Sequence, residues 1–196
     1  MTSLKRTKLR QCTNCLCVIN GVWEWVEECA REAADEEPAM RGILDDVCLS
    51  RNSLATSISA RLARKLSRRD MPRELIEPLI REALADEESI LSQIAHDLIA
   101  IVDRDPACRT PLEPLLFYKG FHAITTYRIS HWLWKHGRTI MALQFQSLAS
   151  EVFAVDIHPA AVIGCGILLD HATSFVVGET AIIRDNVSIL HEVTLG

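Results

Sequence analysis

A branched aliphatic residue returns at every sixth position near the end of this chain. The repeating positions are Ile157, Ile163, Leu169, Val177, Ile183, Ile189 and Leu195, and the third unit is two residues longer than the other complete units. A period of six fits neither an amphipathic helix nor a simple alternating strand. It predicts a solenoid of short strands, in which each unit turns a corner and equivalent units stack about 4.8 Å apart with their first residues pointing inward.

The composition of this segment suits short strands and tight corners. Of its 40 residues 14 are β-branched, and it contains half of the chain's eight glycines and no lysine. The fifth position of each unit is also small or apolar, namely Ala161, Ile167, Thr173, Ala181, Val187 and Val193. The alternative fold, a small conventional β-sandwich with short strands, would not require such a strict six-residue spacing. We expect the two extra residues of the third unit to form an extruded loop that carries Asp170 and His171.

The residues before the repeat have helical periodicity. Helices are predicted over 54–66, 90–102, 115–136 and 139–153. The second of them should end at Asp105-Pro106, because a residue that precedes proline disfavours helical angles. The third should stop at Gly137, which suits a C-terminal cap.

The chain therefore divides into three segments, which are a basic extension over 1–21, a helical domain over 22–154 and an incomplete β-helix over 155–196. The fold class is α+β, with an all-α domain followed by a parallel β-helix. We predict that the extension is disordered, with an organelle-targeting segment as the alternative. Its CxxCxC run lacks the second ligand pair of a structural zinc site, so we expect no metal there.

The charge and hydropathy of the chain restrict its partners. A net charge of −5 argues against a general nucleic-acid binder or a protein of the membrane surface. No uninterrupted apolar run approaches the roughly 18–20 residues that cross a bilayer. The seven cysteines show no regular pairing, which favours reduced thiols. These observations predict a soluble cytoplasmic protein with neither nucleic-acid nor membrane partners.

Several motifs of the chain are similar to those of the serine O-acetyltransferases. They are DIHPAAVIG from Asp156, GILLDHATS from Gly166, VVGETAII from Val176, RDPA from Arg104 and KGFHAI from Lys119. The resemblance implies that the β-helix is left-handed. It also implies transfer of an acetyl group from acetyl-CoA to the hydroxyl of L-serine, which gives O-acetyl-L-serine in the first step of cysteine biosynthesis. Acetyl-CoA would be a co-substrate, with no permanently bound cofactor.

Such a transfer requires a base that removes the proton of the hydroxyl group. Histidine is the usual base, because its pKa lies near the operating pH. His171, on the predicted loop beside Asp170, is therefore the candidate general base. The resemblance implies that Asp156 pairs with His171, and that Asp105 and Asp170 bind the ammonium group of serine. Direct attack of serine on acetyl-CoA needs no acyl-enzyme on a cysteine.

The resemblance assigns other parts of the enzyme to residues beyond Gly196. These are an arginine and a histidine for the serine carboxylate, most of the acetyl-CoA groove, and a tail that binds O-acetylserine sulfhydrylase. The sequence also stops two residues into a repeat, whereas repeat arrays usually need a cap. We therefore expect a fragment that can lack activity on its own. The resemblance further implies homotrimers that pair as a dimer of trimers.

Three alternatives stay open at this point. The first is another hexapeptide acyltransferase with a different acceptor. The second is a trimeric zinc hydratase, because His171 and His191 should stack on adjacent coils, with His158 as a third ligand. The third is a non-catalytic assembly module. Zinc analysis would identify the hydratase, and serine-dependent turnover would exclude the assembly module.

Overall fold

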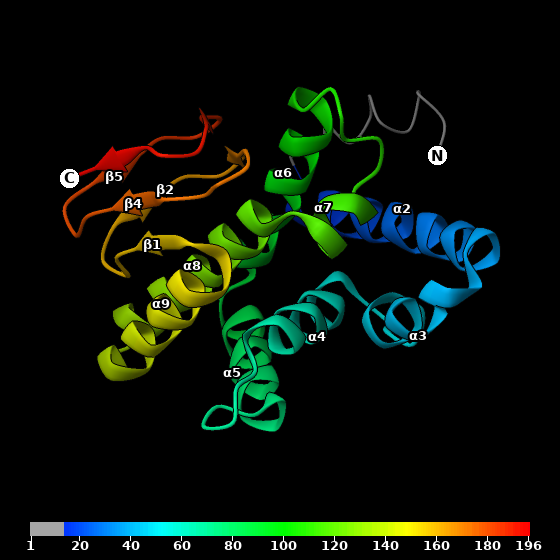
Figure 1. Cartoon of the computed structure of the whole chain (residues 1–196), viewed down its shortest axis with the longest axis horizontal. Helices are drawn as coiled ribbons and strands as arrows, with labels where there is room; N and C mark the ends of the chain where they lie inside the picture. Colours follow the sequence, from blue (N-terminus) through cyan, green and yellow to red (C-terminus); the bar gives the residue numbers. More distant parts are fainter. Residues whose placement is uncertain (1–13) are drawn as a thin grey trace.

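The computed structural model of the chain describes residues 14–196, in which helices are followed by short strands (Figure 1). The helices are α2 (Cys15–Glu36), η1 (Pro38–Met40), α3 (Arg41–Leu44), η2 (Asp45–Leu49), α4 (Leu54–Leu66), α5 (Arg73–Asp86), α6 (Glu88–Arg104), α7 (Leu112–Phe117), α8 (Lys119–Lys135) and α9 (Thr139–Phe153). The strands are β1 (Val155–Ile157), β2 (Val162–Ile163), β3 (Leu168–Leu169), β4 (Phe175–Val177), β5 (Ile182–Ile183), β6 (Ser188–Ile189) and β7 (Thr194–Leu195). In Figure 1 the strands stack over α8 and α9, whereas α2 and α3 lie toward the opposite end.

Helices α4 and α9 have the predicted bounds, and α6 ends directly before Asp105 as expected. The N-terminus of α4 is capped by Ser53, whose side chain accepts a hydrogen bond from the backbone N–H of Thr56. The apolar side chains that recur every four residues along α4 are all buried. None of the helices within residues 14–196 combines the length and apolar character that spanning a bilayer requires.

The predicted helix over 115–136 is wrong in one respect, because the chain forms two helices there, α7 and α8. Tyr118 takes an extended conformation between them, with ψ 110°. The break leaves carbonyls at the end of α7 without helical partners, and buried side chains supply the donors. His122 Nε2 donates to the carbonyl of Leu115 (2.8 Å), and the guanidinium of Arg61 donates to that of Leu116. These tertiary contacts stabilise the break.

The helical domain also begins earlier than predicted, because α2 starts at Cys15. Its N-terminus is capped by Asn14, whose side chain accepts a hydrogen bond from the backbone N–H of Cys17. Val18 and Ile19 are buried, so this part of the chain contributes to the core rather than to an extension. The basic cluster and Cys12 lie outside the described residues.

The strands form a parallel β-helix with three faces, as the six-residue period predicts. The pairings are β1–β4–β7 on one face, β2–β5 on the second and β3–β6 on the third. All of them are parallel, and the partners of β1, β2 and β3 in the next coil lie 20 residues further along the chain, as in Val162 with Ile182. The predicted inward residues from Ile157 to Ile189 are buried. Short strands therefore stack into a continuous apolar interior.

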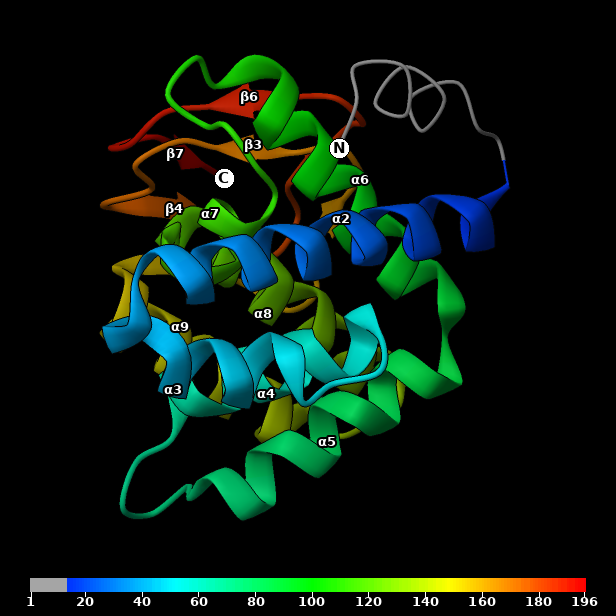
Figure 2. The same ribbon diagram turned by 90° about the vertical axis from the view of Figure 1, so that its right-hand side faces the viewer.

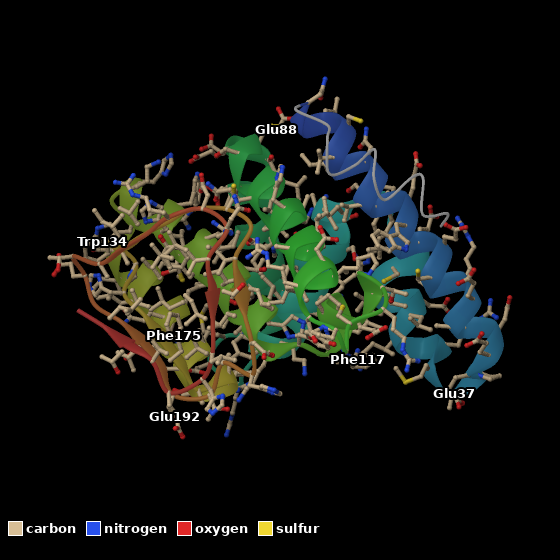
Figure 3. All side chains as sticks on the ribbon, turned by 90° about the horizontal axis from the view of Figure 1, so that it is seen from above. Glu37, Glu88, Phe117, Trp134, Phe175 and Glu192 are labelled. Atoms are coloured by element: carbon tan, nitrogen blue, oxygen red, sulfur yellow. The ribbon has the colours of Figure 1, made fainter. Side chains whose placement is uncertain are left out.

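The two-residue insertion changes which residue of the third unit points inward. Thr173, predicted at the fifth position, is exposed. Phe175 takes that place instead, is 1% exposed and pairs with Val155 in the coil below. Beyond the insertion the partners are 18 residues apart, as in Val176 with Thr194. In Figure 3 Phe175 lies among the strands of the solenoid, whereas Glu192 lies at the outer edge.

Helix α8 lies against the first coil of the solenoid and satisfies its corners. Three side chains of α8 donate to backbone carbonyls of that coil: Tyr127 Oη to Ala161 (2.5 Å), Arg128 Nη2 to Gly164 (2.8 Å) and His131 Nδ1 to Pro159 (2.7 Å). Figure 2 shows the strands on one side of α8 and α5 on the other. The helical domain thus supplies hydrogen-bond donors to carbonyls of the first coil, which has no preceding coil to pair with.

Candidate active site

Three of the four predicted site residues line one pocket. The pocket has a volume of about 350 Å³ and lies where the end of α6, the junction of α7 and α8, and the loop after β3 meet. Its lining residues are Asp105, Ala107, Phe117, Tyr118, Lys119, Gly120, Leu169, Asp170 and His171. The cavity is large enough for a small metabolite. The structure therefore brings Asp105, Asp170 and His171 together.

The β3–β4 loop, residues 170–174, carries His171 at the pocket. The His171 side chain is 75% exposed, and its Nε2 lies 3.8 Å from Asp170 Oδ1. Three non-glycine residues of this loop have left-handed backbone angles: His171 (φ 56°), Ala172 (φ 60°) and Ser174 (φ 59°). This conformation costs L-residues roughly 1–2 kcal/mol each. Such strain persists where surrounding contacts enforce it, and it is concentrated at functional sites.

Backbone hydrogen bonds attach the β3–β4 loop to the coils on both sides. Below it, the N–H of Ser174 donates to the carbonyl of Ala154 (2.9 Å). Above it, the N–H of Glu192 donates to the carbonyl of Thr173 (2.8 Å). The loop is therefore part of the stack rather than a free excursion from it.

Gly120 lets the start of α8 approach the same loop closely. A Cβ built on Gly120 would lie 2.0 Å from the carbonyl oxygen of Leu169 and 3.3 Å from the Cβ of Ala172. Real Cβ atoms do not approach a backbone oxygen so closely, so any larger residue would push α8 and the loop apart. The absence of a side chain at Gly120 thus sets one wall of the pocket.

The pocket contains groups of both charges. Asp105 lies directly after α6, and its Oδ1 accepts a hydrogen bond from the N–H of Ala107 (2.8 Å). Asp170 adds a second carboxylate, and Lys119 adds an ammonium group that donates to the hydroxyl of Thr173. Burial, together with the neighbouring Cys108 and Asp105, raises the pKa of Tyr118, so its phenol stays neutral. Such a set suits a small zwitterion.

Asp156 lies outside this pocket, in β1 of the coil below the loop. Its Oδ1 accepts a hydrogen bond from Nε2 of Gln146 in α9 (2.6 Å). The His171 side chain faces Asp170 and His191, and within residues 14–196 no hydrogen bond joins it to Asp156. The pairing of Asp156 with His171 stays a prediction.

The histidines considered for zinc are only partly brought together. The rings of His171 and His191 stack edge-on with their centroids 6.1 Å apart, as the repeat predicts. His158 instead packs against Trp134, at 5.2 Å between ring centroids. In the part of the chain that the structure describes, no group of three or more His, Cys, Asp or Glu side chains is placed to hold a metal ion. Cys15, Cys29, Cys48, Cys108 and Cys165 are free thiols.

A buried ion pair between α6 and α8 was not predicted from the sequence. Arg128 of α8 donates to Asp97 of α6, with Nη2 2.7 Å from Oδ2 and side-chain exposures of 1% and 0%. Asp97 Oδ1 also accepts a hydrogen bond from the N–H of Ile167 (2.8 Å), directly before β3. The sequence does contain a sign of this ion pair, because Asp97 lies within the apolar stripe of α6. A carboxylate on a buried helix face requires a buried partner.

The chain is similar in sequence to serine acetyltransferases. A family model described as "Serine acetyltransferase, N-terminal" matches residues 22–126. The serine acetyltransferase of Escherichia coli strain K12 is 46% identical over 175 residues, which cover 89% of this chain and 64% of that protein. The chain therefore spans less than two thirds of the length of this relative.

Solved structures agree with the sequence comparison. A serine acetyltransferase in complex with CoA matches with a TM-score of 0.88 and 44% identity, covering 89% of this chain and 75% of the other. The soybean serine acetyltransferase complexed with serine matches with a TM-score of 0.86 and 46% identity, covering 88% and 71% respectively. Both the helical domain and the β-helix take part in these matches, and the β-helix is left-handed as the resemblance implied.

Proposed function

Because the chain belongs to the serine acetyltransferase family, we propose that it transfers the acetyl group of acetyl-CoA to the hydroxyl of L-serine. The products are O-acetyl-L-serine and CoA, in the first step of cysteine biosynthesis. The observation that carries the proposal is the shared pocket of Asp105, Asp170 and His171. Two carboxylates from different elements suit an ammonium group, and the imidazole beside them suits a nearby hydroxyl.

In this reaction His171 acts as the general base. Its imidazole takes the hydroxyl proton while the serine oxygen attacks the thioester carbonyl carbon of acetyl-CoA. The resulting tetrahedral intermediate collapses by breaking the carbon–sulfur bond, and the imidazolium returns the proton to the departing thiolate. General-base help of this kind contributes roughly 10²–10⁴-fold to the rate. The exposure of the His171 side chain supports this role, because a base must reach its substrate.

Asp156 is the proposed partner of the His171 imidazolium. A carboxylate on the second ring nitrogen stabilises the charged ring and fixes its tautomer. The hydrogen bond from Ser174 to Ala154 supports this assignment, because it attaches the loop of His171 to the residues directly before Asp156. Asp105 and Asp170 bind the serine ammonium, and acetyl-CoA is a co-substrate rather than a resident cofactor.

The proposal includes assembly into trimers, two of which pair through their helical domains. Apolar side chains on the outer faces of the solenoid support the trimer. Val162 and Ile182 are paired on the β2–β5 face and are 53% and 63% exposed, and Leu190 is 58% exposed. Exposed apolar groups of this kind are typical of contact surfaces. Binding of O-acetylserine sulfhydrylase and a cytoplasmic location stay predictions.

The test is the release of CoA from acetyl-CoA with and without L-serine. It is made on the 196-residue chain and on a chimera that continues into the C-terminal coils of the E. coli relative. We expect serine-dependent release from at least one form, and its loss in His171→Ala. His136→Ala is the matched control, because His136 is also a solvent-accessible histidine but lies at the far end of α8.

Serine-independent or absent release from both forms would overturn the proposal. Release that depends on another amino acid or on a sugar would instead identify a different hexapeptide acyltransferase. Bound zinc in stoichiometric amount, lost together with His171 or His191, would support the hydratase.

A further inference from the structure

The β3–β4 loop combines left-handed backbone angles with hydrogen bonds to both neighbouring coils. Its left-handed residues His171, Ala172 and Ser174 lie within four positions of one another. Backbone hydrogen bonds from Ser174 and Glu192 attach the end of the loop to neighbouring coils, and the N–H of Asp170 attaches its start to the carbonyl of Ile189 (2.8 Å). Within the loop, the N–H of Ala172 donates to the carbonyl of Asp170 (2.6 Å) and that of Thr173 donates to His171 (2.8 Å), but none of these backbone bonds connects the loop to a helix of the helical domain.

Helix α8 supplies that contact through its first two residues. Gly120 rests against the backbone of Leu169, and the Ala172 side chain is fully buried beneath it. Lys119 extends past this contact, and its ammonium donates to Oγ1 of Thr173. Among the described residues, this hydrogen bond connects a side chain of the helical domain to a side chain of the loop.

We infer that Lys119 is a positioning residue that holds the β3–β4 loop, and with it His171, in place through Thr173. The contact of Lys119 is a charge-assisted hydrogen bond, which is stronger than one between neutral groups. It acts on a loop whose left-handed angles would otherwise relax toward commoner regions. The catalytic meaning of the inference rests on the proposed function, whereas the holding of the loop does not.

The position of Lys119 distinguishes it from an ordinary surface lysine. It lines the same pocket as Asp105, Asp170 and His171 and is half-buried, although its hydrogen bond to Thr173 is exposed to solvent. Lys135, at the other end of α8, provides a contrast, because its side chain is 52% exposed and lies 3.8 Å from Glu87. Exposed pairs of the Lys135 type contribute little.

Hydrogen–deuterium exchange of the peptide 168–176 tests the holding of the loop without any need for activity. We compare the unmodified chain with Lys119→Met, Thr173→Val and the double variant. Loss of a charge-assisted hydrogen bond should speed exchange of the loop amides roughly tenfold in each single variant. The double variant should exchange no faster than Thr173→Val, because Lys119→Met removes the Lys119–Thr173 bond, whereas Thr173→Val removes that bond and also the one from its hydroxyl to the carbonyl of His171 (3.4 Å). Lys135→Met is the matched control and should leave the loop unchanged.

Unchanged exchange in Lys119→Met, or additive effects in the double variant, would overturn the inference. A thermal midpoint that stays the same in all variants excludes a general loss of stability.

Turnover measures the consequence for the reaction, in the form of the protein that is active. Lys119→Met should lower kcat roughly tenfold, because a misplaced base loses its alignment with the hydroxyl, and should leave the KM for acetyl-CoA unchanged. Lys119→Arg should restore part of the rate. Normal turnover in Lys119→Met, beside an inactive His171→Ala, would contradict the positioning role and leave the proposed function intact. Absent turnover in the unmodified chain and the chimera would contradict the proposed function, while the exchange result would still decide whether Lys119 holds the loop.

Discussion

Arg128 and Asp97 form a salt bridge that has almost no contact with solvent, with 2.7 Å between Nη2 and Oδ2. It joins α8 to α6, and through Ile167 and Gly164 it also joins both helices to the first coil of the solenoid. A buried pair is weak evidence for net stability, but removal of one member leaves the other charge without compensation. The pair therefore makes the two domains depend on each other.

We predict that Arg128→Met lowers the free energy of unfolding by about 3–5 kcal/mol, because the buried Asp97 carboxylate then has no counter-ion, although it keeps its hydrogen bond from Ile167. The double variant Asp97→Asn/Arg128→Met should be more stable than that single variant. It removes both charges, while the amide oxygen can still accept from Ile167. Urea denaturation of the three chains measures this. A double variant less stable than Arg128→Met would contradict the electrostatic explanation.

Gly120→Ala should lower the free energy of unfolding by about 1–3 kcal/mol, because its methyl group would collide with the carbonyl of Leu169. In an open helix the same change stabilises by about 0.5–1 kcal/mol. Gly42 in α3 is the matched control, since nothing lies within 4 Å of a Cβ built there. If Gly120→Ala and Gly42→Ala both raised the free energy of unfolding in urea, the result would contradict the close contact between α8 and the loop.

His122 should make the protein less stable in acid. Burial lowers the pKa of this histidine from 6.5 to about 3 in the folded chain. Below about pH 6.5 the unfolded chain therefore protonates this histidine, whereas the folded chain keeps it neutral. The free energy of unfolding falls as the pH drops from about 6.5 toward 3, by up to about 1.4 kcal/mol per pH unit. His122→Gln keeps a donor for Leu115 but does not titrate. Its urea midpoint should depend less on pH between about 7 and 5, and an identical dependence would contradict this prediction.

Loss of one pocket carboxylate should weaken serine binding selectively. Asp105→Asn should raise the KM for serine by roughly 10–100-fold, because a charged hydrogen bond to the ammonium is replaced by a neutral one. The KM for acetyl-CoA should change little. Glu179→Gln is the control, since Glu179 is an exposed acid of the solenoid outside the pocket. Equal changes in both KM values would indicate a general distortion of the site.

The repeat could be predicted because its signal is local and cumulative. Each inward residue, such as Ile163 or Ile183, contributes to the same six-residue period, and one longer unit does not hide it. For the same reason the loop of His171 was predicted as an extrusion. The assignment of Thr173 failed because counting along the sequence cannot tell where an insertion rejoins the strand, whereas the pairing of Phe175 with Val155 can.

The features that could not be predicted depend on contacts between distant residues. The break at Tyr118 is stabilised by His122 and Arg61, which donate to carbonyls at the end of α7. Helical periodicity continues across the break, so the pattern alone favours one helix. The early start of α2 has the same origin, because its first apolar residues become stable only when they pack against the rest of the domain.

The two-residue insertion leaves every strand pairing around it in register. Val155 still pairs with Phe175 before the change in spacing, and Val176 still pairs with Thr194 after it. The extra length is therefore taken up entirely between β3 and β4, and the strands on either side keep their parallel pairing. Residues 170–174 themselves are held from below by Ala154, from above by Glu192 and from the side by Gly120, so the reach of His171 is set by three neighbours at once.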